Sequence, residues 1–166
     1  MMKTYANYLF LTPVYLLMAL LLSCEKGGED GHDVILDDNL LKNESTYSEV
    51  LNARDAGENA PFAIQEVKRK GDSLLIHVLR GCSEDAYKII WNGRIAESHP
   101  AQVHLVLTHE PAGDICQTSS EFLLHIDLRK IIGENSSPED FIFHVANGSV
   151  KQDKSLYPDG TVSTEE

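Results

Sequence analysis

Residues 73–80 read Ser-Leu-Leu-Ile-His-Val-Leu-Arg, and this stretch decides how the rest of the chain is interpreted. Successive side chains of a β-strand point to opposite faces of a sheet, so the stretch divides into two faces. One face carries Leu74, Ile76 and Val78, and the other carries Leu75, His77 and Leu79. The first set is purely apolar. The stretch therefore predicts a strand that buries one face in a core.

The same alternation recurs outward from this stretch at a spacing of about ten residues, which is typical of an all-β sandwich or small barrel. Further strands are predicted over 62–67, 86–91, 103–108, 122–128 and 141–146. Asn92-Gly93 predicts a type I′ hairpin turn, with its return arm over 94–98. The expected fold is an all-β, antiparallel β-sandwich of about seven strands.

Residues 61–150 are predicted to form this β-sandwich domain, because the alternation begins after Pro61 and ends near Val150. Residues 24–60 are acidic and glycine-containing, and predict a flexible tether. Within the tether, Thr46-Tyr47-Ser48-Glu49 fits a capping box and predicts a short helix near 47–55. Residues 151–166 predict a polar C-terminal tail.

The charge balance excludes one class of partner. The chain has 166 residues, with 26 Asp and Glu against 14 Lys and Arg, and a formal net charge of −12. Such a charge repels the phosphates of nucleic acids. No DNA or RNA partner is expected.

The N-terminal residues combine one charge, Lys3, with an almost wholly apolar run from Tyr8 to Leu22. A basic start and a short apolar run are typical of a secretory signal peptide. A membrane-spanning helix needs about 20 apolar residues, whereas this run is shorter and contains Pro13. Residues 1–23 are therefore predicted to form a cleaved signal helix.

The end of that run, Leu21-Leu22-Ser23-Cys24, resembles the lipobox of bacterial lipoproteins. The resemblance covers residues 1–24. It implies that the Cys24 thiol is alkylated with diacylglycerol, that a peptidase cleaves between Ser23 and Cys24, and that the new amino group is acylated. It also implies attachment to the outer membrane of a Gram-negative bacterium through these acyl chains, facing either the periplasm or the cell surface. An ordinary signal peptide that happens to end in Cys is the alternative.

With Cys24 assigned to lipid, two cysteines remain, and two thiols in an oxidising compartment predict a disulfide between Cys82 and Cys116. The alternative is a metal site that adds Asp85, His109 and Asp114. The cysteine pair with Trp91 resembles an immunoglobulin-like core, but only by analogy, since Cys82 follows Gly81 at a strand end.

Four histidines share one pleat phase on four predicted strands: His77, His104, His125 and His144. On adjacent strands, such imidazoles would lie about 5 Å apart and could hold Zn²⁺ or Cu²⁺. Outward polar residues on half-buried strands are the simpler interpretation, so no metal and no cofactor is predicted.

The chain has no Gly-x-Ser-x-Gly, no Cys-x-x-Cys, no phosphate-binding glycine-rich loop and no His-Glu-x-x-His. It is therefore predicted not to be an enzyme. The expected function is a lipid-anchored envelope module that binds a protein or a glycan or serves as an accessory subunit. The alternative is a periplasmic lipoprotein that binds Zn or Cu through the outward histidines.

Overall fold

The computed structural model describes residues 34–79, 86–110 and 120–165, whose strands form two sheets. The smaller sheet is antiparallel and has the order β3-β4-β7. Its strands are Ala63–Lys70 (β3), Ser73–Leu79 (β4) and Glu121–Asp127 (β7). These are three of the predicted strands. Strands β4 and β7 bury the alternating apolar phase that the sequence indicates, whereas β3 buries Ile64 and Val67 on either side of a register shift.

The larger sheet has seven strands in the order β1-β2-β5-β6-β8-β9-β10. They are Val34–Asp37 (β1), Leu40–Lys42 (β2), Tyr87–Ala96 (β5), Ala101–His109 (β6), Phe141–Asn147 (β8), Asp153–Leu156 (β9) and Val162–Glu165 (β10).

Two pairs in the larger sheet, β2–β5 and β6–β8, run parallel, so the prediction of a purely antiparallel sandwich is wrong. Parallel neighbours need a long connection. Here helix Glu44–Ala56 (α2), β3 and β4 separate the first pair in the chain, and β7 and two short helices separate the second. These helices are Arg129–Ile132 (α3) and Pro138–Asp140 (η3). Immunoglobulin-like sheets are antiparallel, so the parallel pairs also distinguish this fold from an immunoglobulin-like one.

Apolar side chains from both sheets meet in one core. Strand β4 contributes Leu74, Ile76 and Val78, and β6 contributes Val103, Leu105 and Leu107, all of them buried completely. The alternation read from the sequence therefore has its physical cause in a two-sheet sandwich that excludes water from one face of each sheet.

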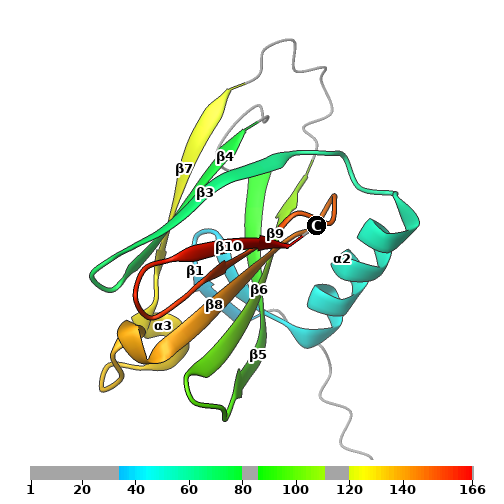
Figure 1. The fold of residues 1–166 in the computed structure, drawn as a ribbon. Helices are drawn as coiled ribbons and strands as arrows, with labels where there is room; N and C mark the ends of the chain where they lie inside the picture. The colour runs from blue at the N-terminus through cyan, green and yellow to red at the C-terminus, as the bar shows by residue number, and fades with distance from the viewer. Residues whose placement is uncertain (1–33, 80–85, 111–119, 166) are drawn as a thin grey trace, which may run out of the picture. The chain divides into compact units, whose positions relative to one another are not determined.

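A second, smaller apolar contact lies on the far face of the larger sheet. There Ile90, Val106 and Ala146 pack against side chains of α2. The described elements thus form three layers: the three-stranded sheet, the seven-stranded sheet and α2 (Figure 1). The helix predicted near 47–55 is confirmed, although it begins at Glu44.

Helix α2 is held at both ends by local chemistry. The Asn43 side chain accepts a hydrogen bond from the Thr46 backbone N–H at 3.0 Å, so Asn43 rather than Thr46 is the N-cap. Gly57 ends the helix with φ of 72°, a conformation that favours glycine. Near the last turn, Arg54 Nη1 lies 3.0 and 3.1 Å from the two carboxylate oxygens of Asp153 on β9.

The predicted boundaries at Pro61 and Val150 are wrong, because residues on both sides of them belong to the larger sheet. Leu40 of β2, placed in the predicted tether, is only 1% exposed and packs in the main core. The predicted polar tail contains β9 and β10. These strands are short and polar on one face, so a period-2 pattern is hardly visible in them.

The predicted hairpin turn at Asn92-Gly93 is also wrong. Strand β5 continues through it, and the register between β5 and β6 shifts between Trp91 and Ile95. Asn92 Oδ1 accepts from the Arg94 backbone N–H at 3.0 Å, and Gly93 has φ of 82°. An Asn-Gly pair suits any position that needs a left-handed residue, and here it forms a bulge rather than a turn.

Candidate functional site

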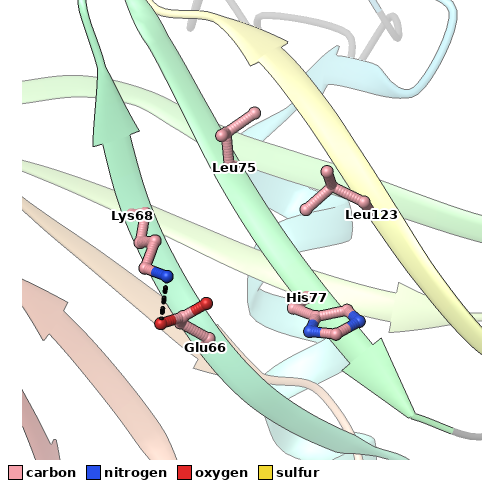
Figure 2. Close-up of a pocket in the computed structure, with 5 residues that line it drawn as sticks. All are labelled: Glu66, Lys68, Leu75, His77 and Leu123. Carbon is pink, nitrogen blue, oxygen red and sulfur yellow. Dashed lines mark ion pairs between the residues drawn. The ribbon is translucent and has the colours of Figure 1, made fainter.

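The outer face of the three-stranded sheet carries a shallow groove of about 280 Å³. Its lining comes from all three strands: Glu66 and Lys68 from β3, Leu75 and His77 from β4, and Leu123 from β7 (Figure 2). This face is turned away from the main core, which lies on the opposite side of the same strands.

The pleat explains why these side chains meet. On β4, Leu75 and His77 alternate with residues buried in the core. The register pairs His77 with Leu123 directly across the β4–β7 ladder, so both point outward. On β3, the register shifts between Ile64 and Glu66, which turns both Glu66 and Lys68 to the outside.

The groove combines apolar and charged surfaces. Leu123 is 54% exposed, although it is a large apolar residue in mid-strand. Lys68 Nζ lies 2.6 Å from Glu66 Oε1, and His77 Nε2 lies 3.4 Å from Oε2 of Glu121. The two leucines offer an apolar contact while the paired charges stay hydrated beside it. A small apolar group flanked by polar groups would fit such a surface.

The four predicted outward histidines do point outward, but the structure divides them between the two sheets. His77 and His125 lie on the outer face of the three-stranded sheet, where the β4–β7 register places them diagonally. His104 and His144 lie on the outer face of the larger sheet. Four imidazoles on opposite faces of a sandwich cannot share a metal ion. Within the described residues, no group of three or more metal-ligating side chains comes together.

His104 and His144 form a stacked pair. They are opposite each other in the parallel β6–β8 ladder, their ring centroids are 4.6 Å apart, and the rings are inclined by 12°. Nδ1 of His144 lies 2.8 Å from Ser155 Oγ, and Nε2 lies 3.1 Å from Gln102 Oε1. Because a carbonyl oxygen only accepts, Nε2 carries the proton and Nδ1 accepts from the serine hydroxyl. This network leaves no lone pair of His144 available for a metal.

Burial lowers the pKa of both His104 and His144 from the ordinary value, and for His144 the neighbouring His104 adds to this effect while Glu165 opposes it. Below about pH 6.5 the unfolded chain therefore binds more protons than the folded protein. The free energy of unfolding is expected to have its full value above that pH. It is expected to decrease as the pH falls toward the lowered pKa values of His104 and His144.

Urea denaturation at about pH 7.5 and about pH 5 checks this expectation. The loss of stability between the two pH values is expected to be smaller in the double variant His104→Gln/His144→Gln than in the wild-type protein. His99→Gln, which removes an exposed imidazole from the bend between β5 and β6, is the matched control and should lose as much as wild type. Equal losses in all three proteins would contradict the assignment.

The remaining predicted site residues have different outcomes. Ser23, Cys24, Cys82, Asp85, Asp114 and Cys116 lie outside the described residues. His109 lies at the end of β6, with its ring centroid 4.8 Å from that of Tyr87. Burial raises the pKa of Tyr87 to about 12 and lowers that of His109. Tyr87 and Trp91 are both buried.

Sequence reasoning missed four of the five groove residues: Glu66, Lys68, Leu75 and Leu123. A signal was present for the two leucines. Leu75 and Leu123 each stand next to a leucine of the buried phase, so the strand has an apolar residue on its outward phase as well. One such leucine is ordinary, whereas several gathered into a patch mark a contact surface, and the sequence does not show that these two meet.

Comparisons with known proteins leave the family open. No family model matches the sequence, and no curated protein matches it. One solved structure with similarity is that of a protein of unknown function, DUF1344, from Bacteroides vulgatus. It is 17% identical to this chain, and the match covers 68% of this chain and 50% of that one, with a TM-score of 0.39. This chain thus matches about half the length of that bacterial protein, and so low an identity and TM-score transfer no function.

Proposed function

We propose that this protein is a lipid-anchored, non-enzymatic binding or accessory module of the envelope of a Gram-negative bacterium. The observation that carries the proposal is the sequence Leu21-Leu22-Ser23-Cys24 at the end of an apolar run. The thiol of Cys24 would form a thioether with a diacylglyceryl group, and hydrolysis of the Ser23–Cys24 peptide bond would free its amino group for acylation.

The chemistry of the anchor suits a body with this charge. One acyl chain gives only marginal membrane binding, whereas two or three chains on one residue hold a protein on the membrane for long periods. A net charge of −12 would otherwise repel anionic head groups. Among the described residues, no helix is long and apolar enough to cross a bilayer.

The groove supplies the surface for the binding part of the proposal. Leu75 and Leu123 can receive an apolar group of an envelope protein or a glycan, and Glu66, Lys68 and His77 can hydrogen-bond its polar neighbours. The metal-binding alternative required the outward histidines to share one face, and it is disfavoured because His104 and His144 lie on the other sheet. A membrane-attached binding module therefore remains the better-supported function.

The anchor is tested by replacing Cys24 with Ala in cells that process bacterial lipoproteins. The wild-type protein is expected in the membrane fraction, with mass spectrometry showing an acylated N-terminal Cys24. Cys24→Ala should lose the acyl mass and remain uncleaved at Ser23. Glu25→Gln is the matched control, since it changes the neighbouring residue and leaves the thiol, and it should behave as wild type. Mature, membrane-bound Cys24→Ala protein would overturn the proposal.

A further inference from the structure

Strand β7 is one margin of the three-stranded sheet, and β4 is the only strand with which it pairs among the described residues (Figure 1). It is seven residues long. An edge strand presents backbone N–H and C=O groups that can pair with another strand, and natural proteins usually protect such edges with charge or proline. In β7 the middle of the outward face is instead Leu123, which is 54% exposed.

The outward side chains of β7 have a pattern that is complementary to itself. Glu121, Leu123 and His125 share the outer face, because they lie opposite Leu79, His77 and Leu75 of β4. Read in the opposite direction, the same three positions place a basic residue opposite an acidic one and leucine opposite leucine. Two antiparallel copies centred on Leu123 would therefore match Glu121 of each copy with His125 of the other.

Other two-fold registers match less well. Successive side chains of a strand point to opposite faces. A pairing that keeps outer residues opposite outer residues can therefore shift only by two residues at a time. Centring on Leu124 would place Glu121 opposite Asp127, and directly opposed like charges destabilise a sheet. Centring on His125 would place Leu123 opposite Asp127. Only the register centred on Leu123, among these three, pairs leucine with leucine and acid with base.

We propose that β7 is a self-association edge, at which a second copy of this chain adds its own β7 antiparallel, centred on Leu123. The two three-stranded sheets then form one continuous six-stranded sheet. On the outer face, the two exposed Leu123 side chains lie side by side, and Glu121 of each copy lies beside His125 of its partner. On the inner face, Phe122 of each copy faces Leu124 of the other.

The Glu121 side chain already lies over the required face. Its Oε2 is 3.4 Å from Nε2 of His77 on the neighbouring strand. The Glu121 side chain is 57% exposed, so it can reach a further imidazole. Pairing would also bring the two grooves together, since Leu123 lines each of them. The result would be one apolar surface across the two-fold axis, larger than either copy offers alone.

Cysteine cross-linking of the full chain in the cell envelope tests the register. In an antiparallel pair, directly opposed Cα atoms are about 4.5–5.5 Å apart, which a disulfide can bridge. Leu123→Cys is therefore expected to give a disulfide-linked dimer with copper-catalysed oxygen as the oxidant, removed by a thiol reductant. Wild type, which keeps the natural cysteines, measures the background.

Two further cysteine variants are matched controls. In the proposed register, the two copies of residue 125 lie four positions apart along the strands, about 14 Å from each other, so His125→Cys should not cross-link. Val162→Cys is exposed on β10, the edge strand of the other sheet, and should not cross-link either. Absence of a Leu123→Cys dimer, or equal cross-linking of all three variants, would overturn the proposal.

A charge exchange provides a second, independent test. His125→Glu would place glutamate opposite Glu121 twice in each dimer, and is expected to remove the Leu123→Cys cross-link when the two substitutions are combined. Adding Glu121→Lys restores opposite charges and should restore the cross-link. Failure of that restoration, with the protein still folded by circular dichroism, would contradict the register. The pairing is independent of the anchor, so it should also be seen in the Cys24→Ala background.

Discussion

A chain that begins at Pro61 is expected not to fold cooperatively, although the predicted β-sandwich domain began there. The deletion removes β1, β2 and α2, which leaves β5 without its parallel neighbour and uncovers Ile90, Val106 and Ala146. A tether could be deleted without any effect on the unfolding transition. Urea denaturation followed by circular dichroism, comparing chains that begin at residues 25 and 61, distinguishes the two.

A point substitution makes the same prediction quantitative. Leu40 is 1% exposed in the main core, and Leu→Ala at such a site costs about 2–5 kcal/mol of unfolding free energy. Ile35 of β1 is 73% exposed and is the matched control, for which Ile35→Ala should change stability by less than about 0.5 kcal/mol. A Leu40→Ala protein as stable as wild type would show that residues 34–60 do not support the sandwich.

Replacing Asn147 with Ala is expected to destabilise the protein by about 2–4 kcal/mol, because buried groups would lose their hydrogen bonds. Asn147 has no exposed surface. Its Nδ2 donates to the Phe62 carbonyl at 3.0 Å, and its Oδ1 accepts from the backbone N–H and the hydroxyl of Ser149 at 2.9 and 2.8 Å. The side chain thus ties the start of β3 to the end of β8.

The measurement is again the midpoint and slope of urea unfolding. Asn52→Ala is the control, since Asn52 is exposed on α2 and alanine has the higher helix propensity. That variant should be as stable as wild type or slightly more so. A double-mutant cycle with Ser149→Ala should show coupling, because both residues share one network. Additive effects, or a loss below about 0.5 kcal/mol for Asn147→Ala, would contradict the role assigned to this amide.

The strands that alternation predicted are those with one face in the main core. Strands β4, β6, β7 and β8 were expected near their observed positions, because burial of one face leaves a period-2 pattern in each of them. Strand β3 and the first part of β5 were also expected, although the register of β3 shifts between Ile64 and Glu66. The outward phase of the four histidines was also predicted correctly. The distribution of these histidines between the two sheets was not predicted. The pleat phase indicates which face of a strand a residue occupies but not which sheet the strand joins.

The errors have a common physical cause. Strands β1, β2, β9 and β10 have only three or four residues each, too few to show a period. Strands β2 and β9 pair with the longer strands β5 and β8, and β1 and β10 pair in turn with β2 and β9. Leu40 lies opposite Ile89 of β5, and the Ile89 N–H donates to the Asn39 carbonyl at 2.7 Å. Such pairing joins residues far apart in the chain and leaves little local pattern.

The groove was missed for a related reason. Leu75 and Leu123 are about fifty positions apart in the chain, and they meet only because the β4–β7 register places their strands side by side. An outward leucine on one strand is unremarkable by itself. Two of them beside the same histidine form a surface, and that depends on tertiary structure.

The sequence by itself determined the predominantly β character, the inward and outward phases of β4, β6, β7 and β8, and the motif at Cys24 on which the proposed anchor depends. It could do so because side-chain alternation and a short motif are local properties of the chain. Only the tertiary structure decided the two parallel pairs, the inclusion of β1, β2, β9 and β10 in the larger sheet, the docking of α2, and the groove with its exposed edge. Each of these depends on which distant strands share backbone hydrogen bonds, and that choice is made by the packing of the whole core.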